Sequence, residues 1–240
     1  MKLFNLNLPS PAGQLAGDEA LLDWCDRGHG EETLLFWEPR TTFVVVGYAN
    51  KVATEVNVTA CAAKGIPIFR RCSGGGTVLQ GAGCLNYALI LRITDDGPCR
   101  TITSANQFIM ERNRAAIAAL LPRPEITVSG HTDLALGGLK FSGNSQRRKK
   151  NFLLFHGTFL LNLDLARVGE FLQMPSLSPG YRARRSHDDF LVNLNLPPEQ
   201  VKAALQKVWS ATEELLNFPE QETRELAAQK YATDVWNLKM

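Results

Sequence analysis

The chain has 240 residues, of which 45% are hydrophobic and 21% are charged, and its formal net charge is +2. These values are ordinary for a globular protein, and a chain of this length can bury a large core without disulfides or metal. A charge so close to zero argues against nucleic acid as the main partner. No segment is long and apolar enough to predict a membrane span.

The five cysteines are odd in number, and no two of them have the C-x-x-C spacing of a zinc or redox motif. We therefore expect reduced thiols, which are typical of the cytoplasm. The first residues lack the apolar run of a secretory signal peptide. These features together predict a cytoplasmic protein, and a monomer is the simplest state.

Hydrophobic periodicity and turn residues indicate how the chain is organised. They predict, in chain order, a helix over 14–27, strands over 33–37 and 42–47, a helix over 54–64, strands over 66–69, 77–79 and 87–93, a helix over 103–121, strands over 126–128, 133–136, 140–142 and 152–161, and helices over 163–172, from 197 onward and over 221–232. Strand runs interleaved with single helices favour an α+β domain.

The most informative stretch is the glycine loop, Arg-Arg-Cys-Ser-Gly-Gly-Gly-Thr at 70–77. Consecutive glycines let the backbone approach a ligand closely, and their bare N–H groups can bind an anion. Arg70 and Arg71 supply positive charge just before it, and Lys140 does so within a second glycine-flanked segment, 138–143. The pattern predicts a site for a small molecule that carries a carboxylate or a phosphate.

Each feature also has a plainer interpretation when taken alone. A triple glycine is more often a flexible turn, and a lone lysine is by default a surface residue. The basic run at 147–150 is most simply a solvated hairpin tip, with docking of an acidic acceptor domain as its functional interpretation. Three arginines in the loop 176–187 are either the same kind of feature or a phosphate clamp: Arg182, Arg184 and Arg185.

Several motifs in order resemble the lipoate–protein ligase family, within the biotin/lipoate protein ligase catalytic superfamily. Residues 70–78, with Gly83 and Asn86 downstream, are similar to its lipoate-binding loop. Residues 133–146 are similar to its catalytic-lysine strand, and 156–161 to its His-Gly-Thr strand. The resemblance covers about residues 1–190, and motifs in the right order are more specific than any one alone.

The resemblance implies a mixed, mainly antiparallel sheet with flanking helices, in a single catalytic domain over residues 1–240. Residues 190–240 would form a helical C-terminal portion, too short to contain the usual accessory domain. The implied reaction uses ATP and Mg²⁺ to convert lipoate to lipoyl-AMP, then transfers lipoate to a lysine of a small lipoyl carrier protein or domain. A separate accessory subunit stays an open possibility.

The resemblance also implies roles for particular residues. Lys140 is expected to be catalytic, with its ammonium on the bridging and carbonyl oxygens of the acyl-adenylate, and Asp133 to bind Mg²⁺ or the nucleotide. An apolar slot for the dithiolane tail is expected at Val45, Val78 and Tyr87. The residues expected to bind substrate or adenylate are Arg70, Arg71, Ser73, Gly74, Gly75, Gly76, Thr77, Asn86, Asp133, Ser142, Gly143, His156, Gly157 and Thr158.

Two departures from the family pattern keep alternatives open. Gln80-Gly81 stands where many members have His-Asp. Related octanoyl- and lipoyltransferases use a cysteine just before the lysine strand, but residues 128–133 contain none, which favours ATP-dependent ligation. A transferase without ATP that uses Cys72 or Cys84 is the main alternative, and a non-catalytic lipoate-binding protein is another. The shape of the apolar slot determines whether the protein prefers lipoate or octanoate.

Overall fold

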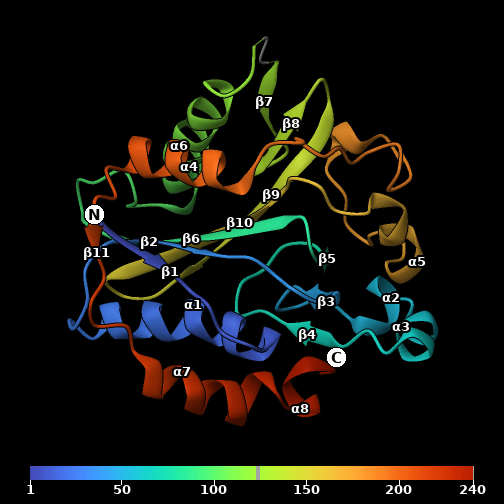
Figure 1. The fold of residues 1–240 in the computed structure, drawn as a ribbon, viewed down its shortest axis with the longest axis horizontal. Coiled ribbons are helices and arrows are strands. Elements are labelled where there is room, and N and C mark those ends of the chain that lie inside the picture. The colour runs from blue at the N-terminus through green and yellow to red at the C-terminus, as the bar shows by residue number, and fades with distance from the viewer. Residues whose placement is uncertain (123–124, 240) are drawn as a thin grey trace.

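An eight-stranded sheet forms the centre of the computed structural model, which describes residues 1–122 and 125–239 (Figure 1). The strand order is β11-β1-β2-β6-β10-β9-β8-β7. The parallel strand β1 (Lys2–Asn5) lies between β2 and β11 (Glu213–Glu214). The strands that pair antiparallel in succession are β2 (Thr33–Trp37), β6 (Cys84–Arg92), β10 (Phe152–Leu160), β9 (Leu139–Arg148), β8 (Asp133–Leu136) and β7 (Ile126–Ser129). The predicted mixed, mainly antiparallel sheet is confirmed.

A second sheet of three strands lies beside the large one and holds the glycine loop. Its central strand β3 (Phe43–Val46) pairs parallel with β4 (Ile68–Arg70) and antiparallel with β5 (Val78–Gln80). Three short helices pack on this sheet through a small apolar cluster: α2 (Val52–Glu55), α3 (Val58–Lys64) and α5 (Val168–Phe171). Because the glycine loop connects β4 to β5, both of its ends are fixed by the pairing with β3.

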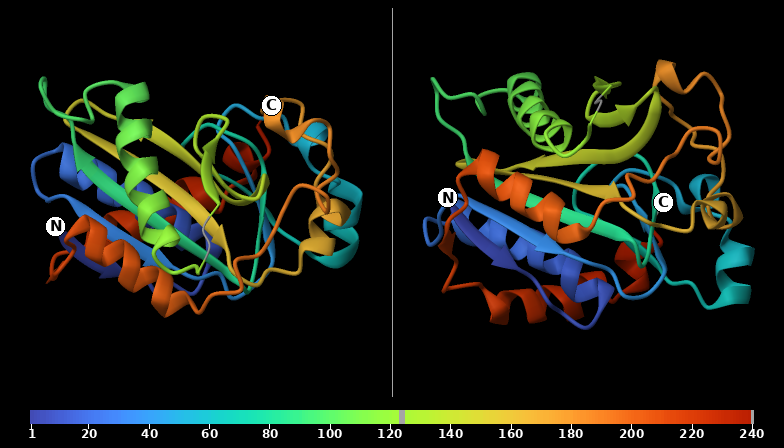
Figure 2. Two further views of the ribbon diagram at one scale, coloured as in Figure 1. Left: turned by 90° about the horizontal axis from the view of Figure 1, so that it is seen from above. Right: turned by 45° about the horizontal axis from the view of Figure 1, so that its top comes forward.

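Helices cover both faces of the large sheet (Figures 1 and 2). The helices α4 (Ile102–Ala118) and α6 (Pro198–Trp209) pack on one face, and α1 (Pro11–Asp26) packs on the other with α7 (Glu220–Leu226) against it. In β6, Leu89 joins the core on the α4 side, whereas Ile90 joins the core on the α1 side. Burial on both faces explains why this strand is nearly all apolar.

Local sequence signals and tertiary pairing account for the differences from the predicted elements. Helix α1 begins at Pro11 because Ser10 caps it, accepting a hydrogen bond from Gly13 N at 3.1 Å. Strand β9 is far longer than the predicted 140–142 because residues Ser142 to Arg148 pair with β10. The predicted helix over 221–232 is α7 followed by a π-helical turn, Ala227–Tyr231.

The residues after Leu191 pack onto the rest of the chain. Helix α6 contacts α4, α7 contacts α1, and α8 (Asp234–Asn237) contacts β4. This C-terminal portion contains the helices α6, α7 and α8 and the short strand β11. Among the residues described, no helix combines the length and the apolar character that crossing a bilayer requires.

Candidate active site

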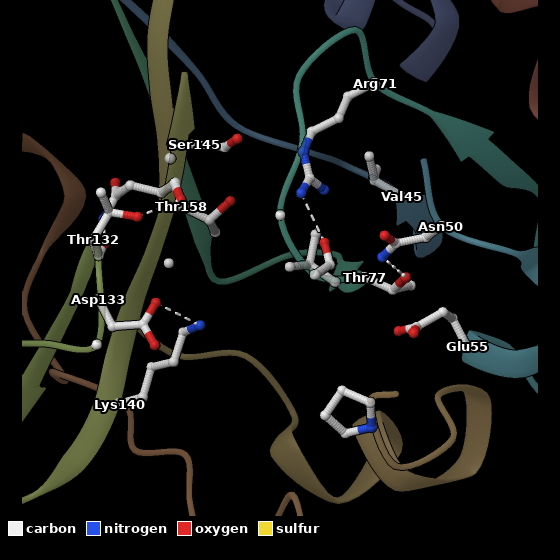
Figure 3. Close-up of a pocket in the computed structure, with 18 of the residues that line it drawn as sticks. Val45, Asn50, Glu55, Arg71, Thr77, Thr132, Asp133, Lys140, Ser145 and Thr158 are labelled. Atoms are coloured by element: carbon white, nitrogen blue, oxygen red, sulfur yellow. Dashed lines mark hydrogen bonds and ion pairs between the residues drawn. The ribbon is translucent and has the colours of Figure 1, made fainter. Parts of the chain in front are cut away.

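A cavity of about 840 Å³ lies between the large sheet, the glycine loop and the segment around 172–190 (Figure 3). It brings together most of the side chains that the sequence analysis selected. Those that line it are Arg71, Gly75, Gly76, Thr77, Asn86, Asp133, Lys140, Gly143, His156, Gly157 and Thr158, with the slot residues Val45, Val78 and Tyr87. Four selected residues do not line it: Arg70, Ser73, Gly74 and Ser142.

Lys140 and Asp133 form an ion pair in the cavity wall opposite the glycine loop (Figure 3). Lys140 Nζ lies 2.8 Å from Asp133 Oδ1, and the Tyr181 hydroxyl donates to Asp133 Oδ2 at 2.8 Å. Burial and the neighbouring Asp133 carboxylate raise the pKa of Tyr181. A Cβ added to Gly143 would lie 2.8 Å from Lys140 Nζ, so the glycine leaves room for the lysine side chain.

The glycine loop is held by its carbonyl groups, and its amides stay available. The Arg71 guanidinium donates to the carbonyls of Gly74 and Gly76, the latter at 2.7 Å. Within the described chain, the N–H groups of Gly74, Gly75 and Gly76 donate no hydrogen bond. Burial lowers the pKa of Arg71 to about 10, so it stays protonated near neutral pH. The loop therefore presents bare donors to an anion.

Arg70 has a different role from Arg71 because neighbours on a strand point to opposite sides. Its side chain is fully buried, and its guanidinium donates to the carbonyls of Gly47, Trp236 and Lys239 at 2.8, 3.1 and 2.6 Å. Arg70, which was predicted to bind substrate, does not line the cavity, and its donors join the glycine-loop strand to the C-terminal segment. Arg70 is thus the arginine that braces the loop, whereas Arg71 lines the cavity.

Ser73, His156 and Asp18 form a buried chain of hydrogen bonds beneath the glycine loop. Ser73 Oγ lies 2.5 Å from His156 Nε2, and His156 Nδ1 lies 2.7 Å from Asp18 Oδ2. A carboxylate only accepts, so Nδ1 carries a proton, and in the neutral imidazole Nε2 accepts from the Ser73 hydroxyl. Arg71 Nε also donates to Ser73 Oγ, at 3.2 Å. The chain fixes the position of the loop.

Buried amides form one part of the cavity wall. Gln80 Nε2 donates to Asn86 Oδ1 at 3.0 Å and to Thr158 Oγ1 at 2.7 Å, and Asn86 Nδ2 donates back to Gln80 Oε1 at 3.0 Å. Gln80, which departs from the family's histidine, thus belongs to a hydrogen-bonded network in the site. The apolar slot is extended by two further lining residues, Leu15 and Trp37.

Asn144 joins the lysine strand to the loop that precedes Asp133. Its Oδ1 accepts from the Tyr87 hydroxyl at 2.6 Å, and its Nδ2 donates to the Thr132 carbonyl at 2.6 Å. A Cβ on Gly157 would lie 1.7 Å from Asn144 Oδ1. Glycine in the His-Gly-Thr motif is therefore required by the asparagine side chain, which lies where a Cβ would be.

The described cysteines are all free and buried. Burial raises the pKa of both Cys72 and Cys84 to about 12, and neither thiol lines the cavity. Both are therefore poor candidates for a thioester nucleophile, because the thiolate is the attacking form.

The described residues contain no group of three or more metal-ligating side chains of the His, Cys, Asp or Glu type. One carboxylate oxygen of Asp133, the residue predicted to bind Mg²⁺, forms the ion pair with Lys140, and the other accepts the hydrogen bond from Tyr181. It does not fit a resident metal without loss of both contacts.

The arginines of the loop 176–187 separate into different roles. Arg182 is buried, lines the cavity and stacks over Phe190 with its guanidinium carbon 4.7 Å from the ring centroid. Arg185 donates to the Gly138 carbonyl at 3.0 Å, and Arg184 is exposed. Only Arg182 is placed to meet a ligand in the cavity.

Sequence reasoning missed three polar residues of the site: Asp18, Asn144 and Tyr181. Asp18 lies within the helix that was predicted over 14–27. The sequence of α1 does not single out Asp18, because the helix contains the half-buried Asp23 and Asp26 as well as the buried Gln14 and Glu19. Tyr181 comes from a loop whose path only tertiary packing determines.

Comparison with known proteins agrees with this geometry. The family model described as "Lipoyl protein ligase A/B catalytic domain" matches residues 10–209. The chain belongs to this family. Among its relatives, the octanoyltransferase LipM of Geobacillus kaustophilus is 28% identical, over 95% of this chain and 94% of that protein. The lipoate–protein ligase 1 of Staphylococcus aureus is 30% identical, over 97% of this chain and 71% of that protein.

Solved structures of the lipoyl protein ligase family have the same fold. A lipoate–protein ligase A solved with ATP has a TM-score of 0.79 and 26% identity, with 99% of both chains covered. A Thermoplasma acidophilum protein named as a candidate lipoate protein ligase, solved with lipoic acid, gives 0.81 and 25%, again with 99% of both chains. A bi-partite ligase of the same organism, studied with its E2 lipoyl domain, gives 0.83 and 25%, over 99% of this chain and 95% of that one. This family contains both ligases and octanoyltransferases.

Proposed function

We propose that this member of the lipoyl protein ligase family is an ATP-dependent lipoate–protein ligase. The observation that carries the proposal is one cavity in which the Lys140 ammonium lies across from a glycine loop with bare amides, next to an apolar slot. Such a cavity suits an acid with an apolar tail and an anionic second substrate. The binding of ATP and of lipoic acid by similar solved proteins supports the same assignment.

In the first half-reaction a carboxylate oxygen of lipoate attacks the α-phosphorus of ATP, and pyrophosphate leaves. The new bond joins the acyl oxygen to phosphorus, giving lipoyl-AMP. The amides of Gly75 and Gly76 would bind the α-phosphate, with Arg71 holding the loop open. Lys140 would leave Asp133 and place its ammonium on the bridging and carbonyl oxygens, where charge develops.

In the second half-reaction the amine of a carrier lysine attacks the acyl carbon. An amide bond forms, the bond to the AMP oxygen breaks, and the amine loses a proton. Lys140 would stabilise the carbonyl oxygen in this step as well. The acceptor would be a small lipoyl carrier protein or domain in the cytoplasm, a compartment that suits a chain whose described cysteines are all free.

Mg²⁺ would enter as part of the ATP substrate, bound mainly by its phosphates. Asp133 could contact that ion only after Lys140 and Tyr181 release its oxygens, so we assign no step to a resident metal. We also propose that residues 1–240 act as one catalytic unit, since α6, α7 and α8 all pack on the described core. A separate subunit could still assist adenylation.

A transferase that moves octanoyl or lipoyl groups without ATP is the second candidate, because the LipM relative matches over nearly its whole length. That reaction needs an acyl acceptor on the enzyme or direct contact between two carriers. Among the cavity-lining residues described, none is a cysteine. The buried positions of Cys72 and Cys84 give no support to a thioester on either.

Mass spectrometry of a lipoyl carrier domain tests the assignment. The protein, ATP, Mg²⁺ and lipoate should add one lipoyl mass to the carrier lysine, and omission of ATP should abolish the addition. An octanoylated carrier offered as donor without ATP should give no transfer. Transfer without nucleotide would identify the second candidate instead. Tight lipoate binding with no transfer under any condition, including with an added accessory subunit, would identify a binding protein.

A further inference from the structure

The basic run at 147–150 is divided by the alternation of strand β9. Arg148 donates to the carbonyls of Cys99 and Arg100, both at 2.9 Å, and Lys149 pairs with Asp23 at 2.9 Å. Arg147 instead shares a face of the strand with Ser145, which lines the cavity. The run is therefore not one hairpin-tip cluster: Arg147 lies on the face of β9 that carries Ser145, whereas Arg148 and Lys149 bond to other parts of the chain.

Arg147 joins a cluster of rings and cations outside the glycine loop. Its guanidinium carbon lies 5.7 Å from the Tyr48 ring centroid, and the Tyr48 and Trp236 rings lie 5.9 Å apart. Lys239 Nζ lies 3.9 Å from the Tyr48 centroid and 3.8 Å from that of Trp236. We call Tyr48, Arg147, Trp236 and Lys239 the basic–aromatic patch.

The positive charge of this patch has no internal counterpart among the described residues. Neither Arg147 nor Lys239 has a described carboxylate within 4.0 Å, whereas nearby Lys230 pairs with Glu19 at 2.6 Å. Tyr48 is 43% exposed, and Arg147 is exposed as well. Tyrosine, tryptophan and arginine side chains, such as Tyr48, Trp236 and Arg147, are enriched at protein interfaces. Carboxylates of a partner would complement the charge.

The patch continues directly from the cavity wall. Tyr48 N donates to the Ser73 carbonyl at 2.8 Å, and the next residues, Ala49 and Asn50, line the cavity. On the other side Ser145, two residues before Arg147, donates to the Gly74 carbonyl at 2.9 Å. A protein bound on the patch would thus lie beside the glycine loop, where a side chain can enter the cavity.

We propose that the basic–aromatic patch is the docking surface for the acyl-accepting carrier domain, through an acidic face of that domain near its target lysine. The proposal rests on the proposed function, because it names the surface that the second substrate occupies. Cations at the rim of an interface mainly raise the association rate. We therefore expect Arg147 and Lys239 to change the affinity for the carrier and the salt dependence of that affinity. The activation of lipoate does not involve them.

Charge-reversal variants of the patch distinguish docking of the carrier from activation of lipoate. Arg147→Glu and Lys239→Glu should each raise the KM for the carrier by about tenfold, and they should weaken its dependence on salt. Lipoate-dependent pyrophosphate exchange, measured without carrier, should keep the wild-type rate, which also reports correct folding. Lys239→Gln serves as a milder variant. The matched control is Lys150→Glu, an exposed reversal at the hairpin tip outside the patch, which should leave the carrier KM unchanged.

Unchanged carrier KM in both patch variants would overturn the docking proposal, and so would an equal rise in Lys150→Glu, which would indicate net charge alone. Loss of pyrophosphate exchange in the patch variants would also overturn it, because the patch would then serve activation or an accessory subunit. If the wild type itself shows no exchange, the proposed function fails. Docking is then measured by calorimetric titration of the carrier into the wild type and into Arg147→Glu, and equal affinity overturns the proposal.

Discussion

The ammonium of Lys140 lies 2.8 Å from the carboxylate of Asp133, in a space that the absence of a side chain at Gly143 keeps open. The lysine is thus held in the cavity by a neighbouring anion. A bound acyl-phosphate would compete with Asp133 for it. Positioned charge of this kind stabilises a transition state at little reorganisation cost.

Lys140→Ala should lower the kcat of lipoyl transfer by roughly 10²–10³-fold, the typical loss for one oxyanion-stabilising donor. Steady-state kinetics with a lipoyl carrier domain checks this. Lys150→Ala, an exposed lysine outside the cavity, is the control and should retain the wild-type rate. A fully active Lys140→Ala variant would remove the lysine from the mechanism.

Gly143→Ala and Gly157→Ala form a matched pair that separates activity from stability. At Gly143 the added Cβ meets the flexible end of Lys140, so activity should fall while the free energy of unfolding changes little. At Gly157 it would lie 1.7 Å from Asn144 Oδ1 and 2.9 Å from a backbone oxygen. Overpacking there should lower the free energy of unfolding by about 1–3 kcal/mol. Urea denaturation beside kinetics checks both, and equal effects at the two positions would contradict this account.

Ser73→Ala should weaken the protein through an unpaired polar group. The change leaves His156 Nε2 without its hydroxyl partner, whereas Arg71 Nε keeps its bond to the Gly74 carbonyl at 3.1 Å. A buried unsatisfied group costs about 1–3 kcal/mol. Ser145→Ala is the control, because it removes a single partly exposed hydroxyl of β9 that donates to the same loop. Thermal unfolding of the two variants measures the difference, and equal midpoints would remove the Ser73–His156–Asp18 chain from the account of the loop.

Thiol reagents should not inactivate the folded protein. Burial raises the pKa of Cys72 and Cys84 to about 12, so both stay protonated at pH 8, where an ordinary thiol is partly ionised. Treatment with iodoacetamide at pH 8, followed by mass spectrometry, should show neither residue alkylated while activity persists. Rapid alkylation of either that lipoate blocks would support the cysteine-dependent transferase.

The raised pKa values of Cys72 and Cys84 also predict that the folded protein loses stability at alkaline pH. In the unfolded chain these thiols ionise near pH 9, but in the folded protein they stay neutral until about 12. Since the unfolded state loses protons first, the free energy of unfolding should fall as pH rises from about 9 to 12. Urea midpoints across this range measure it. Cys72→Ala should flatten the slope relative to Cys61→Ala, a position where the raised pKa is less extreme.

The sequence predicted the sheet, the lysine strand and most of the cavity, because glycine spacing and hydrophobic periodicity are local signals. It could not assign Arg70, since its partners include the carbonyl of Lys239, 169 residues away. Asp18 was missed for a similar reason. The charged residues of a helix usually face solvent, but α1 is covered by the sheet on one side and α7 on the other. The burial and the partners of Arg70 and Asp18 are both determined by packing between distant parts of the chain.

Lipoate-dependent exchange of radiolabelled pyrophosphate into ATP, measured without carrier, tests whether the protein forms lipoyl-AMP with the help of Lys140. We expect exchange with lipoate that is lost in Lys140→Ala, weaker exchange or none with biotin, and no exchange without an acid. Carrier acylation by the wild type with no such exchange, or exchange that Lys140→Ala leaves intact, would contradict this expectation.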